Sequence, residues 1–226
     1  MNKKLLMIGL TPIILLANDQ AIEALNYSVS SNYSTSKYGD NKFLGAKINI
    51  PVYKYIGLGL DTSLSKYNSK NYNYKDTSKS IGLNLLLRDN EIGKIELSYD
   101  YSKTTDNDND KSIGNYININ GAYYYNDFDF SLNRSRYKSK YDFGTFTGFN
   151  TYGSIAYYIN NNFKISTGKS SHENYEVNIQ ASYQPKIFNN SIMLYSGYNK
   201  EYKSYNFGLS YSFDTKVDLK SKIRKY

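Results

Sequence analysis

The sequence contains no cysteine and no tryptophan, and it has only one histidine and three prolines. Without cysteine there is no disulfide, no iron–sulfur cluster and no zinc–thiolate site, and one histidine cannot form an imidazole cluster. Beyond the first residues, no apolar run is long enough for a transmembrane helix, which needs about 20 residues. No nucleotide, phosphate-cradling or paired-carboxylate motif is present. The sequence therefore predicts neither a cofactor nor enzymatic activity.

The first residues are typical of an export signal. Two lysines precede an apolar run over residues 5–17, which is too short to span a bilayer as a helix and is interrupted by Pro12. A basic segment followed by a short apolar segment predicts a secretory signal peptide over residues 1–17. We expect cleavage after Ala17, with Ala21 and Ala24 as alternative positions, and an uncleaved membrane anchor is the alternative interpretation.

Aromatic residues dominate the apolar composition, with 27 Tyr and 10 Phe. In residues 205–213, YNFGLSYSF, a large apolar side chain occupies every second position. Period two predicts a β-strand, because successive side chains of an extended chain point to opposite faces. Twelve segments of this kind follow one another along the chain, with ten as the alternative count.

The connections between these segments alternate in length. Polar connections at 66–79, 103–111 and 136–145 are long, whereas turns such as 126–127 are tight. In an antiparallel meander every second connection emerges at the same end of the sheet. The sequence therefore predicts an all-β fold, a single up-and-down antiparallel barrel over residues 25–213, preceded by a short periplasmic segment at 18–24.

Two features indicate that the apolar face of this barrel meets lipid. The opposite face is mostly Gly, Ser and Asn, whereas the outer face of a soluble protein normally carries many charges. A sheet of twelve strands is also too wide for side chains to fill its centre, because about eight strands already give a just-filled interior. A transmembrane barrel with a wet interior is therefore the preferred interpretation, and a soluble β-sandwich is the alternative.

Aromatic residues on the apolar face collect near the ends of the segments. The expected girdle near the tight turns is Tyr123, Phe128, Tyr157, Phe163, Tyr183 and Phe213, and the one near the long loops is Tyr33, Tyr101, Phe149, Tyr175, Tyr198 and Tyr205. At roughly 3.3 Å per residue and a tilt near 40°, two such rings lie about 20 Å apart, close to the roughly 25 Å apolar band of an outer-membrane barrel.

The alternating segments, the unequal connections and the final strand ending in GLSYSF resemble the bacterial outer-membrane β-barrel superfamily, in a porin-like form. The resemblance implies an outer-membrane location in a Gram-negative bacterium. It also implies insertion by the barrel-assembly machinery, with residues 205–213 as the recognition strand. The chain departs from the family pattern because residues 214–226 follow the terminal aromatic. This segment carries five basic and two acidic residues, and we expect a disordered or peripheral periplasmic tail.

Charged residues are also expected on the predicted lumenal face. They are the cations Lys47, Arg88 and Lys164 and the anions Asp61, Glu96, Asp100, Asp129 and Glu176. In a water-filled lumen such charges bias ion passage, which predicts a weakly selective channel for small hydrophilic solutes. The alternative is a closed structural or surface-interaction barrel, in which these charges neutralise one another and Tyr- and Lys-rich loops bind lipopolysaccharide or partner surfaces.

The net charge of +8 does not indicate a nucleic-acid partner, since the basic residues concentrate in the loops and the tail. Arg134 and Arg136 are expected on the outward face at the upper rim, where guanidinium groups would meet lipopolysaccharide phosphates.

Two weaker motifs carry little chemistry. Residues 106–110, DNDND, lack the glycine and glutamate of a calcium loop and are interpreted as a polar turn. Ser170 and His172 could share a face of an extended segment, but no second histidine or oxyanion motif supports a hydrolase, so a solvated loop histidine is expected.

Overall fold

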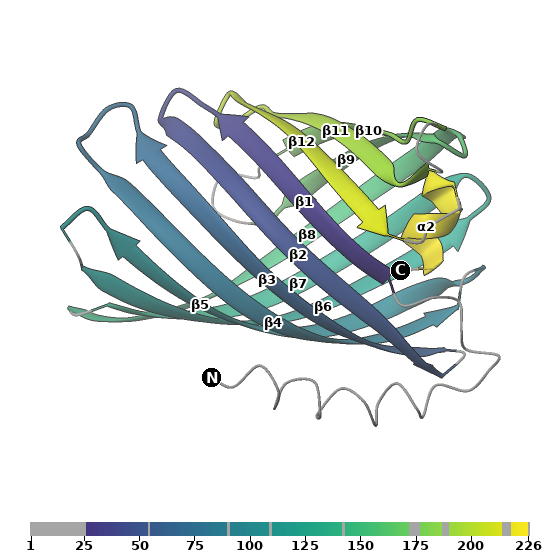
Figure 1. Cartoon of the computed structure of the whole chain (residues 1–226), viewed down its shortest axis with the longest axis horizontal. Helices are drawn as coiled ribbons and strands as arrows, with labels where there is room; N and C mark the ends of the chain where they lie inside the picture. The colour runs from purple at the N-terminus through teal and green to yellow at the C-terminus, as the bar shows by residue number, and fades with distance from the viewer. Residues whose placement is uncertain are drawn as a thin grey trace.

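The chain forms a closed barrel of twelve antiparallel strands in the computed structural model, which describes residues 26–53, 55–89, 91–108, 110–141, 143–171, 177–186, 190–213 and 218–225 (Figure 1). The predicted signal peptide and the segment 18–24 lie outside these residues. The strands are β1 (Asn26–Thr35), β2 (Gly39–Tyr53), β3 (Ile56–Ser69), β4 (Lys75–Asp89), β5 (Gly93–Asp106), β6 (Lys111–Tyr125), β7 (Phe128–Tyr141), β8 (Gly144–Asn160), β9 (Phe163–Ser170), β10 (Val177–Tyr183), β11 (Ile192–Asn199) and β12 (Ser204–Phe213).

Each strand pairs with the next one along the chain, and the first strand pairs with the last. Between β1 and β12 the register runs from Tyr27 opposite Phe213 to Thr35 opposite Tyr205. Closure leaves no free sheet edge, which hydrocarbon requires because an unpaired backbone group there costs several kcal/mol. The predicted twelve-stranded up-and-down barrel is confirmed.

The two faces of the sheet are oriented as the sequence predicts. Leu83, Leu97 and Leu209 point outward and are 57%, 45% and 43% exposed, whereas Ser210 points inward and is 9% exposed. The apolar side chains of all strands form a continuous outer belt, which a single chain cannot expose to water. The belt therefore faces lipid, and the alternative of a soluble sandwich with an apolar core is wrong.

The structure places the described residues of both predicted girdles on this outer face. Tyr33, Tyr101, Tyr123, Phe128, Phe149, Tyr157, Tyr183, Tyr205 and Phe213 are exposed, and Phe163 and Tyr198 are half-buried. Neighbouring rings contact each other at both strand ends: the centroids of Phe128 and Tyr157 are 4.9 Å apart, and those of Tyr198 and Tyr205 are 5.0 Å apart. Tyr175 lies outside the described residues.

The strands extend further than predicted at the end of the long loops. Much of the expected loop 66–79 is strand, because β3 continues to Ser69 and β4 begins at Lys75. The expected loop 136–145 is shortened in the same way, since β7 continues to Tyr141. These stretches consist of polar residues that pair in the ladder above the apolar belt, where water solvates their side chains.

The tight turns lie at the opposite end, which we call the periplasmic end. Asn126 and Asp127 join β6 to β7, and Asn126 has a φ of 51°, a left-handed conformation that asparagine tolerates. Close backbone packing also occurs here, since a Cβ on Gly93 would lie 2.1 Å from the carbonyl oxygen of Ala122.

Replacing Gly93 with alanine is therefore expected to destabilise the barrel by about 1–3 kcal/mol, because backbone must move to admit the methyl group. Gly121→Ala is the matched control on the neighbouring strand, since the nearest atom to its Cβ would be 4.0 Å away. Urea unfolding of both variants in lipid vesicles tests this difference. Equal midpoints for the two variants would contradict it.

Part of the expected disordered or peripheral tail over 214–226 is ordered, and residues 214–217 and 226 lie outside the described residues. Residues Leu219–Lys225 form helix α2 at the periplasmic end, and the Leu219 side chain is 0% exposed (Figure 1). Asp218 caps the helix, because its Oδ1 accepts the backbone N–H of Ser221 at 2.9 Å. Within the described part of the chain, no helix is long and apolar enough to cross a membrane.

Candidate functional site

The candidate site is the barrel lumen, whose wall changes along its height. At mid-height the inward side chains, among them Asn118, Ser154 and Gln180, remain partly exposed, so the lumen is hydrated there. At the periplasmic end the inward tyrosines Tyr124 and Tyr158 are only 4% and 1% exposed. The lumen is therefore a wet, polar space that narrows into a packed periplasmic mouth.

The strand register decides which charged side chains face this space. Of the predicted lumenal residues, the inward face carries Lys47, Asp61, Arg88, Glu96, Asp100, Asp129 and Lys164, and Glu176 lies outside the described residues. Inward positions that the sequence reasoning did not assign to the lumen are Asp76, Lys94 and Asp106. Asp76 and Asp106 fall in the strand extensions that were expected to be loops, and Lys94 follows a tight turn.

Lys47 and Glu96 neutralise each other on the inner wall. The Lys47 Nζ lies 3.1 Å from the Glu96 Oε1, and the Lys47 and Glu96 side chains are 33% and 17% exposed. The Cα of Lys47 is opposite that of Asp61, yet its ammonium group reaches Glu96 instead. Arg88 lines the same small hollow as this ion pair.

Two carboxylates converge at mid-height of the wall. Asp61, Gly82 and Asp100 occupy one row across β3, β4 and β5. A Cβ on Gly82 would lie 2.2 Å from the Asp100 Oδ1 and 2.7 Å from the Asp61 Oδ1, so a side chain there would collide with both groups. Asn84 donates to the Asp61 Oδ2, and Asn118 donates to the Asp100 Oδ2, each at 2.9 Å.

No lysine or arginine of the described residues forms an ion pair with either of these two carboxylates. Amide donors hold them in place without cancelling their charge. At the other end of the same wall, the Cα atoms of Asp76 and Asp106 are directly opposite each other. The inner face of β3–β5 is therefore anionic from the mid-lumen to the end remote from the helix.

Inward tyrosines lie against glycines of the barrel wall, an arrangement that the sequence reasoning missed. In each case a Cβ on the glycine would collide with the tyrosine ring or hydroxyl: the pairs are Tyr67 with Gly39, Tyr137 with Gly148, Tyr152 with Gly168, and Tyr195 with Gly208. The rings lie flat along the wall because glycine leaves room for them. The sequence feature that could have predicted these contacts is a tyrosine on the lumenal face of one strand with a glycine on the adjacent strand.

The periplasmic mouth is occupied by contacts to helix α2. The Arg224 Nη2 and Nε lie 2.8 Å and 3.1 Å from the Asp129 Oδ1. The hydroxyl of Tyr158 donates to the Asp129 Oδ2 at 2.7 Å. Asp129, predicted as a pore-lining charge, therefore lies in a buried polar cluster.

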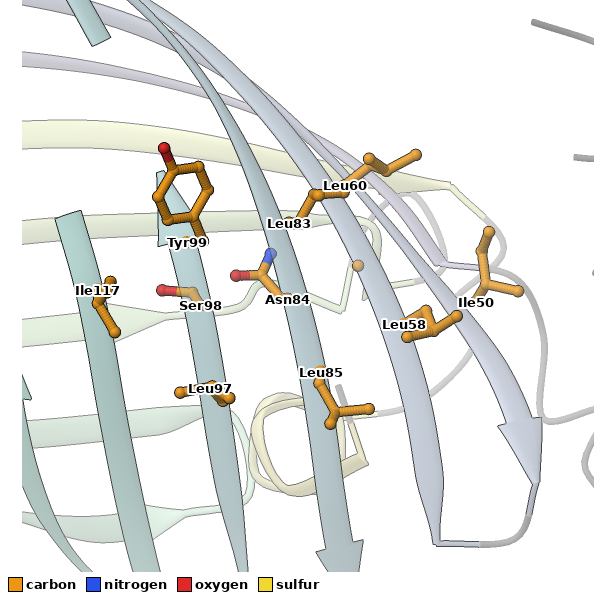
Figure 2. Close-up of a pocket in the computed structure, with 11 residues that line it drawn as sticks. Ile50, Leu58, Leu60, Leu83, Asn84, Leu85, Leu97, Ser98, Tyr99 and Ile117 are labelled. Atoms are coloured by element: carbon orange, nitrogen blue, oxygen red, sulfur yellow. The ribbon is translucent and has the colours of Figure 1, made fainter. Parts of the chain in front are cut away.

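One apolar hollow lies outside the barrel. This groove of about 520 Å³ follows the outward face of β2–β6, and Figure 2 shows the apolar side chains around it. They are Ile50, Leu58, Leu60, Leu83, Leu85, Leu97, Tyr99 and Ile117. Because the groove belongs to the belt, it is covered by lipid and is separate from the lumen.

Basic side chains form a band on the outer face just beyond the apolar belt. The basic band comprises Lys42, Lys66, Lys79, Lys103, Arg134 and Arg136, all exposed. Lys42 is directly opposite Lys66, and Lys79 is directly opposite Lys103. None of the ion pairs among the described residues includes a member of the band.

The two arginines of the band lie before the end of their strand. They point outward from β7, but the strand continues to Tyr141, so they do not lie at its rim. Their guanidinium carbons lie 5.7 Å and 5.9 Å from the centroid of the Phe149 ring, for Arg134 and Arg136 respectively.

The weaker motifs show no catalytic or metal geometry in the described chain. Asp106 accepts the backbone N–H groups of Asp108 and Asp110 at 3.0 Å and 2.9 Å, which agrees with a polar turn. Ser170 donates to the Asn150 Oδ1 at 2.7 Å. His172 lies outside the described residues. No group of three or more metal-ligating side chains is placed to hold an ion in the described part of the chain.

A closed barrel with an apolar outer belt and a polar, charged inner wall is the fold of the porin-like outer-membrane β-barrels. The solved structures that are similar have this fold. The KdgM porin in complex with disordered oligogalacturonate is 15% identical, with a TM-score of 0.59, over 82% of this chain and 99% of that chain. The COG4313 outer membrane channel from Pseudomonas putida F1 is 10% identical, with a TM-score of 0.57, over 84% and 95% of the two chains.

The translocator domain of the autotransporter NalP from Neisseria meningitidis is 8% identical, with a TM-score of 0.52, over 92% of this chain and 93% of that chain. At these identities the likeness concerns the fold. No protein-family model matches the sequence, and no curated protein matches it either. The predicted outer-membrane barrel is thus confirmed in its fold, and the apolar belt fits an outer-membrane location.

Proposed function

We propose that the barrel is a weakly selective channel for small hydrophilic solutes. The observation that carries this proposal is the polar mid-lumen, where hydroxyl, amide and carboxylate side chains remain partly exposed, and so accessible to water, inside a closed wall. Such a wall replaces the hydrogen bonds that a polar solute makes with water. Similar folds described as a porin or a channel lend further support.

The charge distribution supports a mild preference for cations. Asp61 and Asp100 stand together at mid-height without an ion-pair partner among the described residues, while the inward cations Arg88, Lys94 and Lys164 lie nearer the periplasmic mouth. A permeating cation therefore meets carboxylates along most of the lumen. The cations near the mouth oppose this preference and keep it weak.

The double variant Asp61→Asn, Asp100→Asn is expected to reduce the cation-to-anion permeability ratio about sevenfold, because each carboxylate attracts cations and repels anions by the same energy. A carboxylate roughly 7 Å from an ion in water contributes about 0.6 kcal/mol, and salt near 0.1 M halves that figure. Reversal potentials of the refolded protein in a planar bilayer under a salt gradient measure this ratio. Asparagine keeps the size of each side chain, so the conductance is expected to change less than the ratio.

The matched control for this experiment is Asp108→Asn, which removes a carboxylate from an exposed turn. We expect this variant to keep the ratio of the native chain. If the double variant also keeps that ratio while single-channel steps persist, Asp61 and Asp100 do not set the selectivity. If a correctly folded barrel conducts under no condition, the channel proposal is wrong.

A second candidate function, binding of lipopolysaccharide at the outer surface, is favoured by the basic band. Directly opposite like charges on neighbouring strands destabilise a sheet unless an anion neutralises them. The band follows the apolar side chains by one outward position, as in Leu44 and Lys42 or Tyr101 and Lys103. This is the height at which lipid A phosphates meet an outer-membrane protein, and charge complementarity therefore supports them as the partner.

A further inference from the structure

Helix α2 contacts the side of the barrel opposite to the strand from which it emerges. The chain leaves β12 at Phe213, and in the ring of strands β6 is diametrically opposite β12. Nevertheless, Arg224 donates to the backbone carbonyl groups of Asn126 and Phe128 beside the β6–β7 turn, at 2.9 Å and 3.3 Å. Helix α2 therefore lies at the rim across the periplasmic mouth from β12.

Further contacts fix the helix at several points of the rim. The Lys220 Nζ lies 2.8 Å from the Asp127 Oδ1, and the Lys220 backbone N–H donates to the carbonyl of Asn161 at 3.0 Å. Lys94 of β5 donates to the carbonyl of Ile223 at 3.4 Å, near the C-terminal end of the helix, where a cation is favourable. These partners lie on β5, on β7 and on the turns that join β6 to β7 and β8 to β9.

The central contact is a buried ion pair. The side chains of Arg224 and Asp129 are 12% and 10% exposed, so water screens their attraction little. The guanidinium carbon lies 4.7 Å from the centroid of the Tyr124 ring, and the Tyr158 hydroxyl supplies a second donor to Asp129. Loss of Arg224 would leave the Asp129 carboxylate buried without its cation, which is a costly arrangement.

We propose that α2 is a plug that closes the periplasmic mouth of the lumen, and that its release from Asp129 opens the channel. This inference rests on the proposed channel function. The helix is short and cannot be stable alone, because isolated helices below about 12 residues are marginal in water. Its structure therefore depends on docking, and undocking frees the segment without disturbing the strand pairing of the barrel.

The test compares single-channel recordings of four refolded proteins: the full chain, Arg224→Gln, a chain ending at Phe213, and the control Lys186→Gln. The control removes a basic side chain from an exposed position at the periplasmic end, and among the described residues no ion pair joins this side chain to α2. The open probability of Arg224→Gln and of the shortened chain is expected to rise about tenfold or more. The control is expected to match the full chain.

A second measurement follows the docking itself. The chain has no cysteine, so Lys220→Cys and Asp127→Cys together give two unique thiols at a contact of the helix with the rim. A bifunctional thiol-reactive crosslinker with a disulfide in its spacer is expected to hold the channel closed, and reduction of that disulfide is expected to restore its activity. Adding Arg224→Gln is expected to lower the crosslinking yield.

The outcomes separate the two proposals. If all four proteins conduct with equal open probability, the plug proposal is wrong and the channel proposal stands. If none of the four proteins conducts although their barrels are folded, the channel proposal is wrong, and the gating role of the helix is wrong with it. If Arg224→Gln leaves the crosslinking yield unchanged, the buried ion pair does not hold the helix in place.

Discussion

The substitution Leu97→Arg is expected to destabilise the barrel by about 2–4 kcal/mol, which is the cost of a cation near the midplane of a bilayer. Leu97 is 45% exposed on the outer face, and its neighbours across the sheet are Leu85 and Ile119. Both neighbours are apolar, so neither offers the guanidinium a partner. The variant must therefore desolvate its charge or deform the surrounding lipid.

Ser98→Arg provides the matched control, because Ser98 follows Leu97 on the same strand but points into the lumen. There the guanidinium meets water and the carboxylate of Asp100, to which Ser98 donates at 3.3 Å. We expect the free energy of unfolding of this variant to lie within about 1 kcal/mol of that of the native chain, as for substitutions at other solvated sites. Reversible urea unfolding in lipid vesicles compares the two proteins, and similar midpoints would show that Leu97 does not face hydrocarbon.

The orientation of the sheet could be predicted from the sequence because side-chain period and burial are linked directly. A large residue at every second position, as at Leu83, Leu85 and Leu87, fixes both the strand and its lipid face. The ends of the strands could not be predicted in this way. Above the belt both faces are polar, so the alternation disappears from the sequence although the ladder continues, as in β3 up to Ser69.

The lumenal position of the charged residues was predictable from the same two-residue alternation, but their ion-pair partners were not. The alternation places Lys47 and Glu96 on the lumenal face, yet their ion pair depends on the register of strands far apart in the sequence. The same limit explains why the partner of Asp129 was not predicted. Its partner Arg224 lies in a segment whose basic composition indicated disorder.

Helix α2 did leave a signal in the sequence. Asp218 precedes the helix as a capping residue, and Leu219 and Ile223 are four residues apart on one helical face. The segment is too short for propensity to decide, because its stability comes from docking against the barrel. A prediction of the helix required knowledge of the strand register that brings Asp129 and the β6–β7 turn to the periplasmic end.

Replacing Lys42, Lys66, Lys79 and Lys103 together with glutamine is expected to weaken lipid A binding by about a thousandfold at low salt. Each basic side chain near an anionic lipid surface contributes about 1 kcal/mol, and four such terms correspond to roughly this factor. The two directly opposed lysine pairs add to the effect, since a bound phosphate relieves their mutual repulsion. Titration of the detergent-solubilised barrel with fluorescent lipid A measures the dissociation constant.

Two controls separate charge from shape in this titration. Arginine at the same four positions keeps the charges and is expected to retain the affinity, because guanidinium groups bind phosphate at least as well as ammonium groups. Lipid A without its phosphates is expected to bind the native chain and the glutamine variant alike. Higher salt should weaken the native chain more than the glutamine variant, since only the native band is screened. If the glutamine variant keeps the native affinity, acyl-chain contacts with the apolar belt account for the binding, and the basic band has no part in it.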